Sequence, residues 1–159
     1  MKEAVKKADI LIEALPYIRS FKNKVAVIKF GGSLIDDIDI TKFLEDVLFL
    51  SEVGIYPVLV HGGGPLISSM LEERDIESEF VNGLRKTTRE TLEVVREVLI
   101  ERINRSICRA ISNLGGTGKT LSGYDSGSIS GIKLECEGGA DLGYVGEIFD
   151  KIGLCADAE

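Results

Sequence analysis

The first part of the chain has the apolar periodicity of a helix. Apolar side chains recur at spacings of four, three, four and three residues, which predicts an amphipathic helix over residues 2–15. The stripe consists of Ala4, Ala8, Leu11, Leu15 and Ile18. We expect Pro16 to kink or end this helix, because proline lacks an amide proton and crowds the preceding turn.

Two continuous apolar runs follow, and each leads directly into glycines. Residues 24–29 and 56–60 predict strands buried on both faces, as in a parallel sheet. The first run is followed by Gly31-Gly32-Ser33 and the second by His61-Gly62-Gly63-Gly64. A helix is predicted after each loop, so the strand–loop–helix unit occurs twice. This order indicates an α/β fold with a parallel sheet.

Three helices are predicted after these strands, together with short strands near the end. The helix over residues 38–53 ends at Gly54, and Pro65 suits the first turn of a helix running to about residue 73. The longest helix spans residues 88–113. Its expected buried stripe is Leu92, Val95, Leu99, Ile103, Ile107 and Ala110. Short strands are expected over residues 117–121, 128–134 and 143–149.

Composition and charge exclude several classes of protein. The chain has 159 residues, 44% hydrophobic and 28% charged, which is typical of a globular domain. A net charge of −7 argues against general nucleic-acid binding. Three cysteines and one histidine without metal-ligand spacing argue against a zinc site. Asp9 and Glu13 interrupt any signal-peptide core, and no run of about 18 apolar residues occurs, so we expect a cytoplasmic protein that does not engage a membrane.

The two glycine loops are the first candidates for chemistry. Ligands of open α/β sheets bind at the carboxyl ends of strands, where glycine amides approach an anion without hindrance from a Cβ atom. Lys29-Phe-Gly31-Gly32-Ser33 adds an ammonium group to such a loop. We interpret the two loops as a phosphate or carboxylate site. The alternative is that the glycines only form tight turns, and that His61 orients its loop by hydrogen bonding.

Two other segments carry weaker signals. Gly115-Gly116-Thr-Gly118-Lys119-Thr120 is similar to a phosphate-binding P-loop, but it has Asn113 where that motif needs glycine and it follows a helix. We therefore do not interpret it as a nucleotide site. In the loop before residue 88, Arg85 could clamp a carboxylate, or be a solvated arginine. Either Thr88 with Thr91 or Thr87 with Glu90 can cap the long helix.

Four motifs occur in the same order in N-acetylglutamate kinases of the amino acid kinase superfamily, which the chain therefore resembles. They are Val27-Ile-Lys29-Phe-Gly31-Gly32-Ser33, Val60-His61-Gly62-Gly63-Gly64-Pro65, Phe80-Val-Asn82-Gly83-Leu84-Arg85 and Asp141-Leu-Gly143-Tyr-Val-Gly146-Glu147. The resemblance covers about residues 9–148. It implies a three-layer α/β/α sandwich with a mainly parallel central sheet, of which this chain is a truncated form.

The resemblance also implies a reaction and roles for residues. The family transfers the γ-phosphoryl group of ATP to the side-chain carboxylate of N-acetyl-L-glutamate, a step of arginine biosynthesis. Lys29 would be the catalytic residue that stabilises the transferring phosphoryl group, and Arg85 would bind the substrate's α-carboxylate. Four glycines would supply backbone amides, Gly31 and Gly32 to phosphate and Gly63 and Gly64 to the substrate. ATP with Mg²⁺ would serve the complete enzyme, with no cofactor bound tightly to this chain and no metal site.

The same resemblance implies a domain organisation and partners. Residues 1–20 would form an N-terminal helix, residues 21–150 the acetylglutamate-binding domain and residues 151–159 a tail, with the nucleotide-binding lobe absent. Homo-oligomers would form through the helix 88–113, and the N-terminal helix 2–18 would provide a second surface. Two alternatives stay open. One is a non-catalytic module for ligand binding or oligomerisation, and the other is an aminoadipate-type kinase.

Overall fold

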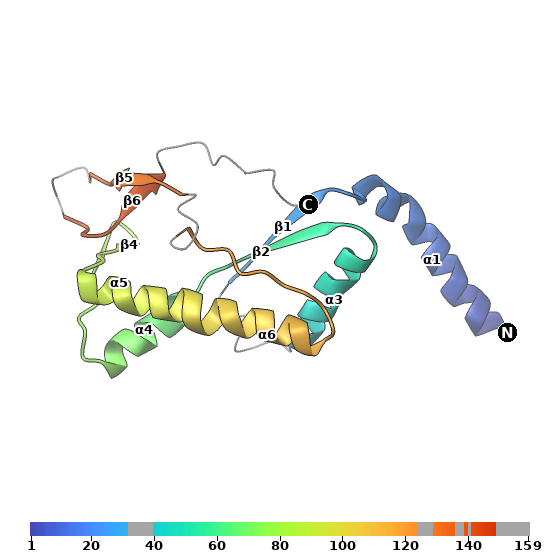
Figure 1. The fold of residues 1–159 in the computed structure, drawn as a ribbon, viewed down its shortest axis with the longest axis horizontal. Helices are drawn as coiled ribbons and strands as arrows, with labels where there is room; N and C mark the ends of the chain where they lie inside the picture. Colours follow the sequence, from blue (N-terminus) through green and yellow to red (C-terminus); the bar gives the residue numbers. More distant parts are fainter. Residues whose placement is uncertain (32–39, 124–128, 136–138, 140, 149–159) are drawn as a thin grey trace. The chain divides into compact units, whose positions relative to one another are not determined.

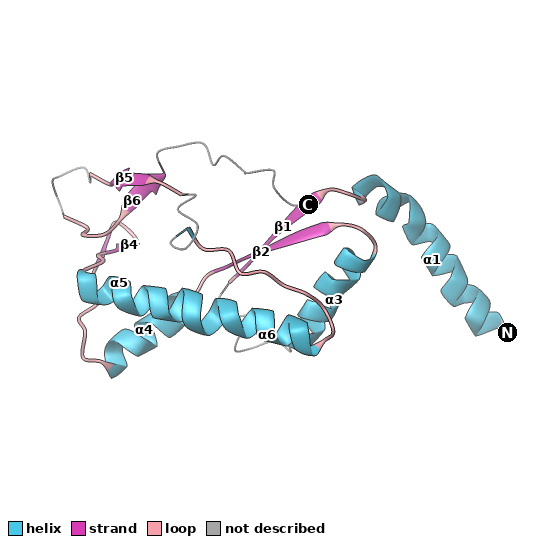
Figure 2. Cartoon of the chain, in the orientation of Figure 1, coloured by secondary structure: helices cyan, strands magenta, loops and turns pink. Residues whose placement is uncertain are grey.

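A computed structural model describes residues 1–31, 40–123, 129–135, 139 and 141–148. The chain forms two compact units. The first contains residues 1–62 with 113–116, and the second contains the remainder. Helices and strands alternate in the first unit, and the second unit has helical segments between short strand pairs (Figure 2).

The first unit contains the predicted parallel strand pair. β1 (Val25–Phe30) and β2 (Tyr56–His61) run side by side in the same direction, paired in register along their whole length. α3 (Ile40–Glu52) packs on β2 (Figure 1). The turn from α3 into β2 uses Gly54, whose φ of +85° is the left-handed conformation expected at the end of a helix. The structure therefore confirms the two strands, their parallel pairing and the glycine that ends α3.

Burial of these strands differs from the expectation. Val25 and Val27 are 65% and 68% exposed, and residues along β1 alternate between exposed and partly or fully buried. The prediction that β1 is buried on both faces is wrong for this chain. The physical reason is that this sheet has two strands within the described residues, and none of the described residues of the first unit covers the face that carries the two valines.

α1 (Lys2–Phe21) is longer than the predicted helix and passes through Pro16. Of the two expected effects of Pro16, a kink or an end of the helix, the end is wrong. Proline at this position removes the amide that would bond to the carbonyl of Ile12. Because no residue of α1 is buried, water can satisfy that carbonyl, and the helix tolerates the loss.

The second unit is built on a long helical segment. α5 (Arg89–Arg96), the π-helical η1 (Glu97–Asn104) and α6 (Arg105–Asn113) together span the predicted long helix. α4 (Gly64–Glu73) packs against α5. Thr88 is the N-cap, since its hydroxyl accepts a hydrogen bond from the amide of Thr91 at 3.2 Å. The structure selects this pair over Thr87 with Glu90.

The buried stripe of the long helix matches the prediction at Ile103 and Ile107 and differs from it elsewhere. Its members are Thr91, Val94, Val98, Ile103, Ile107 and Ile111. Leu92 is 38% exposed, whereas Val94 is 1% exposed. The spacing from Val98 to Ile103 is five residues, as a π-helical turn produces, so the buried face continues onto Ile103 and Ile107. A period of 3.6 residues applied throughout cannot follow this shift.

Two short antiparallel pairs complete the second unit. β3 (Phe80–Val81) pairs with β4 (Leu84–Arg85), and β5 (Gly131–Lys133) pairs with β6 (Gly146–Ile148). The second pair matches the strands expected over 128–134 and 143–149, in shorter form. Residues 117–121 form no strand, contrary to expectation. A strand needs a pairing partner, and the described residues offer none to this segment.

Candidate active site

The carboxyl ends of β1 and β2 lie together, as the two glycine loops predicted. Phe30 and His61 are paired in the last register position, and the Gly62 amide donates to the Phe30 carbonyl at 3.3 Å. Gly31 and Gly62 therefore follow adjacent strand ends. Gly32, expected to bind phosphate, lies outside the described residues.

Phe30 determines which way Lys29 points. The Phe30 side chain is 5% exposed and packs its ring 5.2 Å from that of Phe43. Neighbouring residues of a strand face opposite sides, so burial of Phe30 places Lys29 on the exposed side. Lys29 is opposite Val60 in the register. The ammonium group is thus exposed beside a strand end, where a phosphoryl group could approach it.

His61 belongs to the loop structure. A ring nitrogen, Nδ1, donates to the carbonyl of Gly62 at 3.3 Å, and the ring lies 6.2 Å from that of Phe30. These contacts favour the interpretation in which His61 orients the loop.

In the second unit, Gly63 and Gly64 open helix α4 but differ in their surroundings. Gly63 is the buried N-cap residue, and a Cβ atom there would lie 2.7 Å from Leu99 Cδ2 and 2.9 Å from Ile103 Cδ1. A residue larger than glycine at position 63 would therefore force the ends of these two side chains to move. Gly64 is exposed, with no atom within 4 Å of the place a Cβ would occupy. The helix start at Gly64 is open to a ligand.

Arg85 ends β4, and neutral groups hold its guanidinium. Nη2 donates to Ser68 Oγ at 2.8 Å, and Nη1 donates to Ser78 Oγ. The guanidinium carbon lies 4.5 Å from the centre of the Phe80 ring, within the range of a cation–π contact. Ser68 belongs to α4, so Arg85 is linked to the helix that begins at Gly64.

The Asp141-Leu142-Gly143-Tyr144 segment forms backbone hydrogen bonds with the chain just after Arg85. The Thr87 amide donates to the Leu142 carbonyl and the Tyr144 amide donates to the Thr87 carbonyl, both at 2.8 Å. Gly143 has a φ of +71°, and a Cβ atom there would lie 2.2 Å from the Thr87 carbonyl oxygen. Only glycine lets the backbone at position 143 come this close to Thr87, which explains in structural terms why the motif has glycine there.

The carboxylates near this hairpin are bonded to lysines. Glu79 accepts from Lys86 Nζ at 2.8 Å, and this bond is the main reason that the pKa of Lys86 is raised. Asp141 pairs with Lys133 at 2.8 Å, which is the main cause of the lowered pKa of Asp141. Arg85 makes no ion pair with a carboxylate among the described residues.

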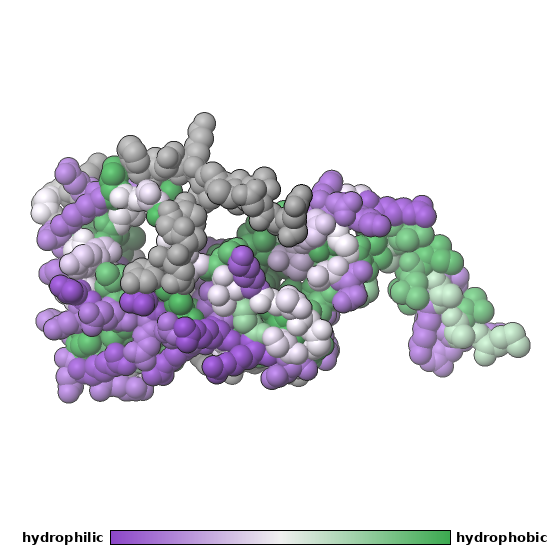
Figure 3. All heavy atoms as spheres, in the orientation of Figure 1, coloured by the Kyte–Doolittle hydropathy of each residue, from purple (hydrophilic) through white to green (hydrophobic). Residues whose placement is uncertain are grey.

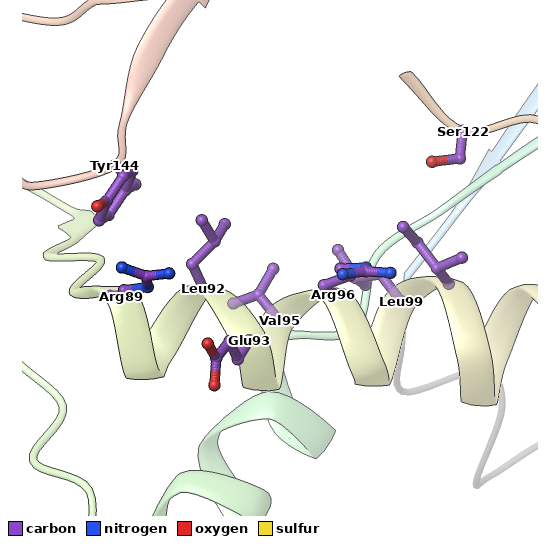
Figure 4. Close-up of a pocket in the computed structure, with 9 residues that line it drawn as sticks. Arg89, Leu92, Glu93, Val95, Arg96, Leu99, Ser122 and Tyr144 are labelled. Atoms are coloured by element: carbon purple, nitrogen blue, oxygen red, sulfur yellow. The ribbon is translucent and has the colours of Figure 1, made fainter. Parts of the chain in front are cut away.

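A hollow of about 680 Å³ lies along the other apolar face of the long helix (Figure 4). Leu92, Val95 and Leu99 form its floor, with Arg89 and Tyr144 at one end. These three apolar residues are the first half of the stripe that the sequence predicted to be buried. In the second unit they line an open surface instead.

The described residues hold no candidate metal site and no membrane-spanning helix. No three histidine, cysteine or acidic side chains among them gather closely enough to hold a metal ion. None of the helices within these ranges is both long and apolar enough to cross a membrane.

Comparison with known proteins assigns the family. The sequence pattern described as "Amino acid kinase family" matches residues 24–151. The chain belongs to the amino acid kinase family. Acetylglutamate kinase from Caldanaerobacter subterraneus subsp. tengcongensis is 47% identical over 93% of this chain and 49% of its own. The corresponding enzyme from Halothermothrix orenii is 45% identical over 93% of this chain and 52% of its own. This family member thus spans about half the length of the curated relatives it matches.

Solved structures support the fold. The protein smu.665 from Streptococcus mutans UA159 aligns with a TM-score of 0.68 at 24% identity, covering 80% of this chain and 50% of its own. N-acetylglutamate synthase from Neisseria gonorrhoeae aligns with a TM-score of 0.65 at 23% identity, covering 87% of this chain and 31% of its own. The mixed α/β arrangement around β1 and β2 is therefore shared with known structures.

The sequence did not indicate Ser68 and Ser78. Ser68 is 17 residues from Arg85 and Ser78 is seven residues away, and both are exposed. A weak signal for Ser68 is its place one helical turn after Gly64, which puts it on the same side of α4. Hydrogen bonds between distant surface residues have no periodic pattern that could identify the pair.

Proposed function

We propose that this chain forms the acetylglutamate-binding part of an acetylglutamate kinase. The observation that carries the proposal is its identity of 44–47% with several acetylglutamate kinases over more than nine-tenths of its length. The environment of Arg85 supports it, because a guanidinium bonded only to hydroxyl groups can still bind a carboxylate.

Each predicted site residue has a role in this proposal. Arg85 binds the α-carboxylate of N-acetyl-L-glutamate, and the amides at Gly63 and Gly64 bind near the carboxylate that reacts. Lys29 stabilises negative charge on the phosphoryl group during transfer, with the amides of Gly31 and Gly32 beside it. Phosphoryl transfer depends mainly on positioning and charge neutralisation, which is what this set of groups offers.

ATP with Mg²⁺ would supply the phosphoryl group. Exposed Lys29 fits an anionic phosphate, whereas no cluster of acidic side chains among the described residues fits a metal ion. Mg²⁺ would therefore arrive with the nucleotide.

The proposal includes a three-layer α/β/α sandwich as the complete fold. The open face of β1, with Val25 and Val27 more than half exposed, supports it, because parallel sheets are ordinarily covered on both faces. Sequence corresponding to the other half of the relatives would bind ATP. We expect the 159-residue chain by itself to show no kinase activity in an assay for ADP release. ADP release that depends on N-acetylglutamate would contradict this.

Binding of N-acetyl-L-glutamate, measured by calorimetry, tests the substrate assignment. Arg85→Ala should weaken binding by about 100-fold, because it removes a charged two-point contact made in the ground state. Lys29→Ala should leave binding nearly unchanged, since Lys29 acts on the phosphoryl group. Equal losses in both variants would contradict the roles. Calorimetry with a panel of ligands that contains aminoadipate derivatives distinguishes an acetylglutamate kinase from an aminoadipate-type kinase.

A second candidate is an assembly module. It is favoured by α1, which has no buried residue, and by the hollow beside Leu92, Val95 and Leu99. We propose that a second copy of the chain packs on the long helix and that α1 joins such dimers. Light scattering on the whole chain and on a chain starting at Ser20 tests the role of α1. Leu92→Asp tests whether the hollow is the contact surface between copies, and it should lower the molar mass measured by light scattering. Glu93→Asp at the rim of the hollow is the control and should leave that molar mass unchanged.

A further inference from the structure

Arg85 differs from Arg74 and Arg102 of the second unit in the charge of its partners. Arg74 and Arg102 both bond to the carboxylate of Glu97, at 2.7 Å and 3.0 Å. Arg85 bonds to two serine hydroxyl groups. Hydroxyls accept hydrogen bonds without neutralising the guanidinium, so Arg85 keeps its full positive charge for an incoming anion.

The backbone around Arg85 is held independently of its side chain. Arg85 pairs with Phe80 across the β3–β4 hairpin, and its carbonyl accepts from the Thr87 hydroxyl at 3.0 Å. Thr87 is in turn bonded through its backbone to Leu142 and Tyr144. The part of Arg85 that can still change its conformation is the long side chain, and the two serines form hydrogen bonds with its guanidinium group.

The guanidinium has donors to spare. It carries five N–H groups, of which the two serine bonds use one each on Nη1 and Nη2. Three N–H groups remain for a carboxylate, so a substrate does not have to displace the serines. Stacking on Phe80 limits the guanidinium to one plane.

We infer that Ser68 and Ser78 are positioning residues that hold the Arg85 guanidinium in place for the substrate carboxylate. Ser68 matters most, because it lies on α4, the helix that begins at Gly64. Its hydroxyl therefore sets the guanidinium relative to the helix start that would bind the other end of the same substrate. The inference rests on the proposed function for the identity of the anion. An arginine fixed before binding loses less side-chain freedom when the ligand arrives.

The test is nitrogen-15 NMR of the Arg85 side chain in the full 159-residue protein without ligand. Arg85→Lys assigns the signal. In the unsubstituted protein we expect slow rotation of the guanidinium, seen as separate Nη signals. Ser68→Ala should speed rotation and merge them, whereas Ser68→Thr, which restores a hydroxyl, should preserve them. Ser69→Ala is the matched control, because Ser69 is exposed on the same helix and its hydroxyl bonds to no other described residue.

The second measurement is the affinity for N-acetyl-L-glutamate of the same variants. Ser68→Ala should weaken binding about tenfold and Ser78→Ala by a smaller factor, with Ser68→Thr near the unsubstituted value. Far-UV circular dichroism checks that each variant is folded, which the exposure of both serines favours.

The outcomes separate the two proposals. If the Arg85 signals are the same in Ser68→Ala, Ser78→Ala and the unsubstituted protein, the positioning inference is wrong, whatever binds. If the signals change as expected but N-acetylglutamate binds to no variant, the serines do hold Arg85 and the proposed substrate is wrong. If the signals change and N-acetylglutamate binds equally well to all variants, the serines do not position Arg85 for this substrate.

Discussion

The N-terminal helix α1 and the long helical segment α5–η1–α6 were both predicted from apolar stripes, yet their environments are opposite. No residue of α1 is buried, and Figure 3 shows hydrophobic side chains on its surface. In the second unit, Val94 and Val98 are at most 1% exposed. A stripe of apolar residues therefore predicts that a helix forms, whereas the burial of that stripe depends on what packs against it.

The two helices also differ at their N-termini. The long segment begins at Thr88, whose hydroxyl bonds to the Thr91 amide, and Thr91 Oγ1 lies 3.0 Å from Thr88 Oγ1. This pairing lets Thr91 be fully buried although it is polar. α1 begins after Met1 without a side-chain cap. If α1 contributes little to folding and the long helix contributes much, matched substitutions in the two should differ widely.

The largest difference is expected from Val98→Asp against Leu11→Asp. Val98 is 0% exposed, and an unpaired charge there should cost about 4 kcal/mol of unfolding free energy or more. Leu11 is 67% exposed, so its substitution should cost less than about 1 kcal/mol. Urea denaturation followed by circular dichroism measures both. Similar losses would mean that α1 is buried in the folded protein.

A smaller effect is expected from Thr88→Ala. Removing an N-cap hydroxyl costs about 1 kcal/mol of unfolding free energy, because the Thr91 amide loses its partner. Thr88→Ser keeps the hydroxyl and is the control, with a loss well below that of alanine. If alanine and serine variants unfold at the same urea concentration, the cap contributes nothing.

The sequence predicted the local structure better than the packing. Turn residues such as Gly54 and Pro65 act through local backbone geometry, and the structure places both as expected. Before Ile103 the buried face of the long helix differs from the predicted face, because the π-helical turn after Val98 changes the spacing of the buried residues. No residue type identifies such a turn in the sequence. The open face of β1 was missed because local pattern cannot show how many strands a sheet contains.

The residues proposed for binding show the same difference between local motifs and tertiary contacts. Lys29, Gly64 and Arg85 could be named from motifs of neighbouring residues and from the resemblance that those motifs carry. Ser68 and the Thr87–Gly143 bridge depend on tertiary contacts between distant residues, so the sequence alone could not reveal them.

The pH dependence of stability gives a still smaller difference. The pKa of Glu97 is lowered, chiefly by its hydrogen bond to Arg74 and also by Arg102. Its stabilising effect is therefore complete above the ordinary glutamate pKa and is lost as the pH falls through the lower, folded-state value. Glu97→Gln should make unfolding free energy less dependent on pH in this acidic range, as urea titrations at a series of pH values would show.

Glu3→Gln in α1 is the control, because the Glu3 and Lys7 side chains are 84% and 74% exposed and their attraction is screened. An equal change of slope in both variants would contradict the assignment.

The smallest effect on folding is expected from removing residues 1–19. Since no residue of α1 is buried, a chain starting at Ser20 should unfold at nearly the same urea concentration as the whole chain when both are dilute. If α1 joins copies of the chain, the whole chain alone should become more stable as protein concentration rises, because association stabilises the folded state by mass action. Denaturation at two concentrations a hundredfold apart, with light scattering on the same samples, measures both effects.

A large loss of stability in the dilute shortened chain would show that α1 packs on its own unit. Equal stability of both chains at every concentration, with equal mass, would show that α1 neither folds onto the protein nor assembles it.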